Sequence, residues 1–394
     1  MRSRILSFSI SFLTISLTVA PAWAQETRVG EITQRQAEKA SRLQPNVPGK
    51  GERFLNWLQA HADDPNTVYL TFGGLYPSAG FAPGVALRHA FGHARFNTGI
   101  GYSVRSYKMV QASLDFPELA DDHLEIGSRV RWTDATQVPF YGVGNDTSKD
   151  DRVAYGLKRL DAGVSATFKP LWWTRVGGGV AYNRYEDREG AGSRPSIETI
   201  ESFVPGLFSE ARYTHASAFA AIDWRESGGY SRRGGLYSVT LNDYKDSNDT
   251  FGFRRIDAEV QQFVPLLKEQ WVLAFRALVQ TTEAQDNELV PYYLLPTLGG
   301  ARRHRGYSDF RFQDRHLMVL SGEYRWLPSR VVDMALFFDA GKVTHDRSDL
   351  DFDGLKTAFG IGFRVHGPNI TPVRIDVAHG REGLRVHLTG GIPF

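Results

Sequence analysis

The feature of this sequence that most constrains its fold is a period of two, which runs from residue 68 to residue 394. Apolar and polar residues alternate in many stretches, one of which sets Leu124, Ile126, Val130 and Trp132 against Glu125, Arg129 and Arg131. Successive side chains of an extended strand point to opposite faces, so each stretch has one apolar and one polar face. The alternation therefore predicts an antiparallel all-β structure after residue 65.

Two architectures use such strands, a soluble sandwich and a transmembrane barrel. A single sandwich domain seldom exceeds about 250 residues, whereas the alternation covers most of this 394-residue chain. The polar face is rich in Arg, Asp and Glu, and the apolar face carries aromatic residues near strand ends: Tyr69, Trp132, Tyr141, Trp172, Trp224, Tyr237, Trp271 and Trp326. An apolar outside, a polar inside and aromatic girdles are typical of outer-membrane β-barrels. We therefore predict an all-β transmembrane protein, an antiparallel outer-membrane β-barrel.

The same alternation gives about sixteen strands, an even number as bacterial barrels require. The predicted strands are 68–76, 82–91, 94–104, 106–116, 122–133, 153–168, 172–186, 212–225, 235–246, 251–265, 270–284, 315–327, 331–343, 355–367, 371–380 and 384–394. The long connections follow odd-numbered strands: 134–152, 187–211, 285–314 and 344–354. Short periplasmic turns and long outer loops produce this segregation. Counts of about 14 or about 18 strands also fit the pattern.

The first 65 residues have a different character. Residues 1–24 read as a secretory signal, with Arg2 and Arg4 at its start and an A-x-A cleavage site at its end. An uncleaved anchor is the alternative, although the apolar run is short for a membrane-spanning helix. Residues 25–65 contain two short helical patterns, which either dock on the barrel or form a frayed tail. We expect the N-terminus in the periplasm and the barrel over residues 66–394, in the cell outer membrane.

Composition argues against several classes of function. The chain has no cysteine and a net charge of +2 without a basic domain, so we expect no disulfides, no cysteine metal site and no nucleic-acid partner. No G-x-S-x-G, H-E-x-x-H or P-loop motif occurs, so we expect no enzyme and no cofactor. Residues 349–354 copy the start of a calcium loop, but Gly360 stands where its bidentate Glu would be. We expect a hairpin turn there, with weak cation or lipopolysaccharide-bridging contact as the alternative.

A basic, glycine-rich loop precedes two strands that carry acidic residues on the polar face. The loop is Gly299-Gly300-Ala301-Arg302-Arg303-His304-Arg305-Gly306-Tyr307. Glu323 alternates with apolar residues in the first strand, and Asp339 does so in the second. Both carboxylates therefore point away from the apolar side, where an arginine of the loop can meet them.

These segments resemble motifs of the outer-membrane protein 85 superfamily, which includes BamA, TamA and the two-partner secretion transporters. The tripeptide Arg305-Gly306-Tyr307 resembles the (V/L)RG(F/Y) motif of the family's sixth loop. Further matches follow in order: residues 321–325 are similar to E-(F/Y)-R, 337–341 to F-x-D-x-G, 360–364 to G-x-G-x-R, and 372–376 to P-(L/I/V)-R-(I/L/V)-D. The final Phe394 resembles the bacterial signal for barrel assembly. The resemblance covers residues 68–394 and is firm from Leu298 onward.

The resemblance implies that Arg305 enters the barrel and pairs with Glu323 and Asp339, which holds the loop against the inner wall. Members that insert or secrete proteins carry POTRA domains before the barrel. About 40 residues stand between the signal and the barrel here, too few for one such domain, so the likeness is to a subgroup without them.

For this subgroup the resemblance implies a fold more than a function, and our first hypothesis is that the protein helps to insert or translocate protein or lipid at the outer membrane. The expected partners are outer-membrane lipid and lipopolysaccharide, the barrel assembly machinery during biogenesis, and a protein or lipid client. A weak seam between the first and last strands would serve this function, because Gly390 and Pro393 disturb the end of the last strand. The alternative is a plugged or passive pore or a structural barrel, and an enzyme is the least favoured hypothesis.

Overall fold

The computed structural model describes residues 53, 64, 66–200, 204–266, 270–329, 331–367 and 371–394. The chain divides into two units, Met1–Arg53 and Phe54–Phe394, and the strands all belong to the second. The predicted signal (1–24) and nearly all of the predicted helical segment (25–65) lie outside the described residues. Within the described ranges, no helix is long and apolar enough to cross a membrane.

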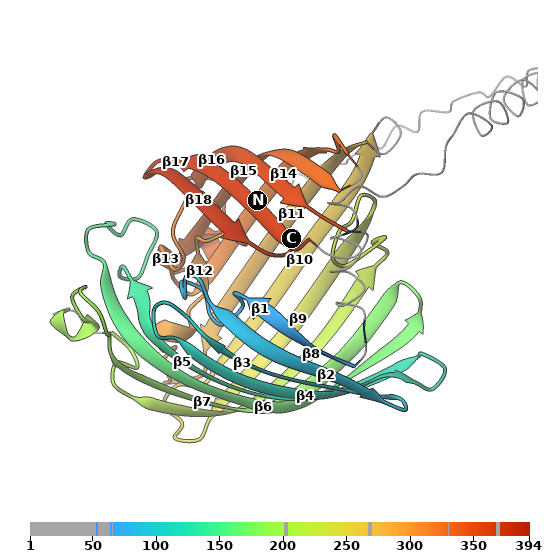
Figure 1. Ribbon diagram of the computed structural model, residues 1–394. Coiled ribbons are helices and arrows are strands. Elements are labelled where there is room, and N and C mark those ends of the chain that lie inside the picture. The colour runs from blue at the N-terminus through green and yellow to red at the C-terminus, as the bar shows by residue number, and fades with distance from the viewer. Residues whose placement is uncertain are drawn as a thin grey trace, which may run out of the picture. The chain divides into compact units, whose positions relative to one another are not determined.

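Among the described residues there are eighteen strands, and sixteen of them form one antiparallel sheet (Figure 1). The strands of this main sheet follow one another in chain order. They are β1 (Thr67–Phe72), β2 (Pro83–Phe91), β3 (Ala94–Tyr102), β4 (Lys108–Leu119), β5 (Leu124–Phe140), β6 (Val153–Leu171), β7 (Thr174–Glu189), β8 (Glu210–Asp223), β9 (Gly234–Asp246), β10 (Phe253–Leu266), β11 (Trp271–Ala284), β14 (His316–Trp326), β15 (Val332–Thr344), β16 (Lys356–Val365), β17 (Val373–Gly380) and β18 (Gly383–Thr389). The other two, β12 (Thr297–Leu298) and β13 (Phe312–Gln313), form a hairpin between β11 and β14.

The structure confirms the predicted all-β fold of consecutive antiparallel strands. The main sheet has the predicted sixteen strands, counted over the described residues. The hairpin of β12 and β13 falls in a segment, 285–314, that we predicted as a loop; strands of two residues are too short to show a period. The sheet begins at β1 and ends at β18, and no ladder joins these two within the part of the chain that the structure describes. They are therefore its two edges.

The last strand is shorter than the sequence predicts. We expected it to run over 384–394, but β18 ends at Thr389. Gly391 has a φ of +79°, in the region that favours glycine, and beyond it the chain is no longer part of the sheet. Phe394 lies in a buried cluster with Phe263, Val272 and Ala274. The C-terminal ring is thus buried and does not share the exposed face of β18.

The two faces of the main sheet differ as the alternation requires. One face, the outer face, exposes apolar side chains, among them Val130, Val164, Val180, Leu241 and Phe338. The opposite, inner face carries polar side chains that bond to one another; for example, Asn183 donates to Asp161 at 2.5 Å. An apolar outer face and a polar inner face are what a barrel in lipid needs.

Long connections follow β5, β7, β11 and β15 at one end of the strands, the long-loop end; the opposite end is the short-turn end. Two of these connections contain the 3-10 helices η1 (Ile197–Thr199) and η2 (Tyr292–Leu294), which join a buried cluster on the inner face. Its large members include Phe140, Tyr155, Tyr185, Tyr213, Phe253 and Tyr292. The hydroxyl of Tyr292 donates to Asp187 of β7 at 3.1 Å. These two connections are therefore held against the inner face.

Candidate functional site

Strands β14 and β15 bring two carboxylates to the inner face. In their antiparallel register Ser321 lies opposite Asp339, and Glu323 lies opposite Phe337. Glu323 is 3% exposed and Asp339 is 1% exposed, because alternation turns both away from the outer face. Carboxylates removed from water in this way need cationic partners.

Arg305 lies between these two carboxylates and pairs with both. Its Nε and Nη2 donate to the two oxygens of Asp339 at 2.8 and 2.7 Å, a bidentate geometry that matches the guanidinium group. Its Nη1 donates to Glu323, and its backbone N–H donates to Asp339 at 3.0 Å. The guanidinium carbon also lies 3.5 Å from the ring centroid of Phe337. Two strands therefore hold the Arg305 side chain at once.

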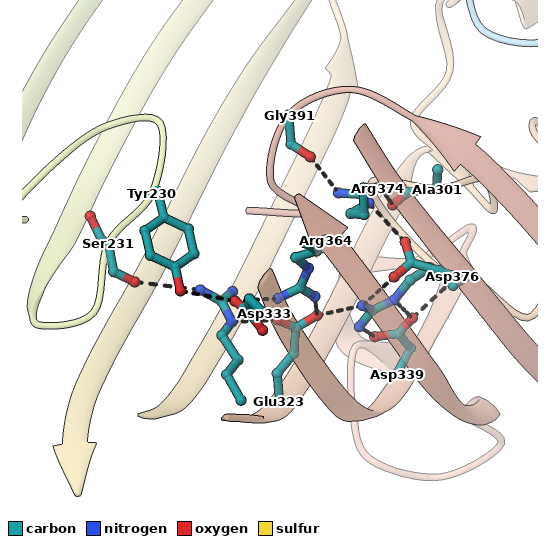
Figure 2. Close-up of polar contacts among 12 residues, drawn as sticks. Tyr230, Ser231, Ala301, Glu323, Asp333, Asp339, Arg364, Arg374, Asp376 and Gly391 are labelled. Carbon is teal, nitrogen blue, oxygen red and sulfur yellow. Dashed lines mark hydrogen bonds and ion pairs between the residues drawn. The ribbon is translucent and has the colours of Figure 1, made fainter. Parts of the chain in front are cut away.

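Glu323 binds two further arginines. Nε of Arg325 donates to its Oε2 at 2.7 Å, and Nη2 of Arg364 in β16 donates to its Oε1 at 2.8 Å. Arg364 also lies 3.6 Å from a carboxylate oxygen of Asp333, at the start of β15. Figure 2 shows Glu323, Arg364 and Asp333 in one chain of contacts. The contacts of Arg305 thus continue toward the short-turn end.

A second branch leads from Arg305 to β17. Asp376 lies 3.9 Å from Nη1 of Arg305 and forms an ion pair with Arg374 at 2.8 Å. Nη2 of Arg374 donates to the carbonyl of Ala301 in the loop at 2.8 Å. We call the charged residues of both branches the ionic cluster. Its members are Arg305, Arg325, Arg364, Arg374, Glu323, Asp333, Asp339 and Asp376. The positive and negative charges of these members balance.

Burial and charge act in opposite directions on Arg305. Burial alone would lower the pKa of its guanidinium, but the attraction of Asp339 and Glu323 outweighs burial and raises the pKa above its ordinary value. Arg305 is therefore charged at any physiological pH. Buried charges are costly to desolvate, so the cluster is stable only while each member keeps its partners.

The backbone of the loop is held as firmly as its arginine. The carbonyl of Arg305 accepts a hydrogen bond from Nε2 of His387 in β18 at 2.8 Å. Gly306 lies so close to Ala358 of β16 and Gly380 of β17 that a side chain at this position would overlap Ala358. The loop tip therefore contacts every strand from β14 to β18.

Tyr307 and His304 pack beside Arg305. Tyr307 is buried in an apolar cluster with Leu278, Leu298, Phe312, Leu317, Val319 and Val343. Nε2 of His304 donates to the carbonyl of Lys356 at 2.7 Å, and its ring meets Tyr307 edge to face at 4.8 Å. Gly299, the first residue of the loop, has a φ of +122°, which suits glycine. The glycine that begins the loop therefore has a conformational role.

Acidification is expected to weaken the packing of this loop. Burial lowers the pKa of His304, although Asp339 and the Lys356 carbonyl favour its protonated form. The unfolded chain takes up this proton at a higher pH than the folded protein does. The free energy of unfolding should therefore fall as the pH drops below about 6.5. Urea titrations at about pH 8 and about pH 5 should differ more for the wild type than for His304→Gln; equal differences would eliminate His304 as the cause.

The calcium-like segment 349–354 binds a lysine of the same chain. Nζ of Lys342 donates to a carboxylate oxygen of Asp351 at 2.7 Å and to the carbonyl of Asp353 at 2.8 Å. The N–H of Asp353 donates to the same carboxylate at 3.0 Å. The segment belongs to the connection between β15 and β16, which contains the 3-10 helix η3 (Arg347–Asp349). Over the described residues, no group of three or more His, Cys, Asp or Glu could hold a metal ion.

The structure brings together five residues that the sequence singled out: Arg305, Gly306, Tyr307, Glu323 and Asp339. Phe394 lies apart from the loop, with its ring centroid 5.4 Å from the guanidinium carbon of Arg325. Our sequence-based site did not include five members of the ionic cluster: Arg325, Asp333, Arg364, Arg374 and Asp376. Alternation puts each of them on the polar face of its strand, and it already placed Arg325 beside Glu323 and Asp333 beside Asp339 in the sequence.

Comparison with known proteins identifies the family. Residues 90–391 match the model of the Omp85 superfamily domain. The crystal structure of BamA from Haemophilus ducreyi lacking POTRA domains 1–3 is similar, with a TM-score of 0.62 at 16% identity over 83% of this chain and 70% of that chain. CdiB from Escherichia coli has a TM-score of 0.56 at 12% identity over 84% of this chain and 63% of its own.

No curated protein sequence matches this chain, and at such identities the structural likeness shows the fold alone. The family model, however, spans well over half of the sequence. The matched residues include strands β3 to β18 and the loop that carries Arg305. The protein therefore belongs to the Omp85 superfamily of outer-membrane β-barrels.

Proposed function

We propose that this protein helps to insert or translocate protein or lipid at the outer membrane, by opening between β1 and β18. Membership of the superfamily supports this proposal, since other members of the superfamily insert or secrete proteins. The observation that carries it is that the two edge strands, β1 and β18, are short and not paired with each other over the described residues. We call the place where they would meet the seam.

The two strands of the seam are short and have unpaired edges. β1 has 6 residues and β18 has 7, whereas β5, β6 and β7 have 17, 19 and 16. No ladder connects β1 with β18 over the described residues, so each presents free N–H and C=O groups. In a bilayer such groups need partners, and an extended segment of a client supplies them by strand addition. Short strands can form few cross-strand hydrogen bonds, so any pairing of β1 with β18 would be weaker than the pairing among β5, β6 and β7.

The orientation and partners belong to the same proposal. Residues 1–24 would direct export, and residues 25–65 would lie in the periplasm. The apolar outer face would contact lipid and lipopolysaccharide, and the barrel assembly machinery would act during biogenesis. The client is a protein or a lipid, and the proposal involves no catalytic step and no cofactor.

A disulfide across the seam tests this mechanism. The chain has no native cysteine, so a pair placed at exposed positions of β1 (Val68 or Leu70) and β18 (Val386 or Leu388) can form an intramolecular disulfide only across the seam. In liposomes, the wild type should speed the folding of a urea-denatured outer-membrane barrel, followed by heat-modifiable gel mobility. The oxidised pair should abolish this acceleration, and reduction should restore it.

A disulfide elsewhere on the outer face is the matched control. Leu241 of β9 and Ile256 of β10 lie opposite each other and are both exposed, so cysteines there cross-link strands that are already paired. This control should leave the acceleration unchanged. Equal acceleration by the seam-locked protein in its oxidised and reduced forms would contradict the proposal.

A plugged pore is the second candidate, and the long connections held against the inner face favour it. Tyr292 bonds to Asp187, and Arg305 anchors the loop farther along the chain. Planar-bilayer conductance separates the two candidates. Conductance that rises in Arg305→Ala supports a pore closed by this loop, and an absence of conductance in both forms counts against a pore.

A further inference from the structure

The turn between β8 and β9, residues 224–233, lies at the short-turn end and contacts a distant part of the sheet. We call it the strap. In the sheet, β9 is followed by β10 and β11 before β14 is reached. A turn that covered only its own hairpin would stay near β8 and β9. The strap instead contacts β14, β15 and the connection between β16 and β17.

Tyr230 is the centre of this contact. Its side chain is buried, and its hydroxyl donates to a carboxylate oxygen of Asp333 in β15 at 3.1 Å. Its ring stacks on His366, which follows β16, with centroids 3.8 Å apart and planes 11° apart. Figure 2 shows Tyr230 reaching from its turn toward Asp333. Because both its hydroxyl and its ring have partners, the Tyr230 side chain is held in a single orientation.

The residues on either side of Tyr230 are held as well. The carbonyl of Gly229 accepts from the hydroxyl of Thr371, just before β17, at 3.2 Å. The carbonyl of Ser231 accepts from Nη1 of Arg325 in β14 at 3.5 Å. Residues 229–231 therefore contact three separate segments of the distant wall: β14, β15 and the connection between β16 and β17. Three contacts of this kind indicate a specific attachment.

The strap also has internal bonds that keep its shape. The hydroxyl of Ser231 accepts from the N–H of Ser227 at 3.2 Å and donates to its carbonyl. At its start, Arg225 pairs with Asp223 at 2.9 Å. Because the strap is braced within itself, it is expected to detach from the wall as one piece.

Two routes connect the strap with the loop that carries Arg305. One runs from Tyr230 to Asp333, then through Arg364 to Glu323. The other runs from the Ser231 carbonyl through Arg325 to the same glutamate. Arg305 pairs with Glu323 directly. Both routes therefore meet at the carboxylate that seats the loop.

We propose that the strap closes the short-turn end of the barrel interior, and that the ionic cluster couples this closure to the seating of Arg305. When Arg305 leaves Glu323, that carboxylate draws Arg364 and Arg325 more strongly. Their contacts with Asp333 and with the strap then weaken. Release of the loop thus loosens a segment that it does not touch, which is a coupling free energy between two sites. The inference depends on these contacts and not on the insertion function.

A single reporter cysteine measures whether the strap is closed. Ser231 is 1% exposed, so in Ser231→Cys a water-soluble maleimide reacts when the strap detaches; because the thiol replaces a hydroxyl that braces the strap, every rate is compared with that of Ser231→Cys alone. Tyr230→Ala removes the bond to Asp333 and the stack on His366, and labelling should become at least tenfold faster. Tyr230→Phe keeps the stack and should give a smaller increase. An unchanged labelling rate in Tyr230→Ala would contradict the proposal that Tyr230 holds the strap closed.

The coupling is tested in the same reporter background. Arg305→Ala should speed labelling severalfold although it does not touch the strap, and Arg305→Lys, which keeps the charge but loses the bidentate bond, should give an intermediate rate. Arg302→Ala, at an exposed arginine of the same loop, is the control and should match the parent. Heat-modifiable mobility identifies the variants that are folded. If the folded Arg305 variants label at the parent rate, the coupling is wrong.

Discussion

Replacement of Arg305 by alanine is expected to lower the free energy of unfolding by about 3 to 5 kcal/mol. The substitution removes the ion pairs of Arg305 with Asp339 and Glu323. Glu323 keeps Arg325 and Arg364, but over the described residues Asp339 has no other ion-pair partner. A buried carboxylate without a cation accounts for most of the expected loss.

Urea titration followed by heat-modifiable gel mobility measures this effect. Arg305→Lys should recover part of the stability, because an ammonium group restores the charge without the bidentate geometry. Arg302→Ala is the matched control, since Arg302 is exposed in the same loop, and it should change the midpoint little. If Arg305→Ala and Arg302→Ala unfold at the same urea concentration, the buried ion pairs do not stabilise the barrel.

Gly306→Ala should be nearly as damaging, although it adds a single carbon. The new Cβ would overlap the methyl group of Ala358 on the inner wall. Overpacking of this kind costs about 1 to 3 kcal/mol. The loop must also move away from the wall, which disturbs the bonds of the neighbouring Arg305. We expect a lower urea midpoint and faster proteolysis of the loop.

The overlap with Ala358 suggests a second substitution that should restore stability. In the double variant Gly306→Ala/Ala358→Gly, the methyl group moves from the wall to the loop, and most of the lost stability should return. Ala358→Gly alone measures the cost of glycine in β16 and completes the cycle. A double variant no more stable than the sum of the single changes would mean that this contact does not explain the loss.

Much of the fold follows from local chemistry. Strand β10 was predicted at 251–265 and spans Phe253–Leu266, because lipid and the interior select opposite residue types along each strand. The end of β18 could not be predicted from this alternation. The alternation continues formally to Phe394, but Gly391 adopts a positive φ and the strand has already ended. An alternating pattern does not report where a chain leaves its sheet.

The candidate site likewise contains residues that the sequence predicts and contacts that it does not. Alternation places Glu323 and Asp339 on one face, and a glycine-rich loop upstream carries the arginine. The contact of Tyr230 with Asp333 joins residues 103 positions apart. It depends on a turn reaching past β10 and β11, and periodicity carries no information about such a path. The ammonium group of Lys342 at Asp351 likewise depends on how one connection folds back on its strand.

The contact of Lys342 with Asp351 affects how the connection between β15 and β16 depends on divalent cations in the medium. A metal ion in a calcium-like loop exchanges with the medium, and its occupancy varies with the supply of divalent cations. The ammonium group of Lys342 is covalently part of the chain and cannot be washed out. The connection between β15 and β16 therefore keeps its counter-ion in chelator-treated or cation-starved cells.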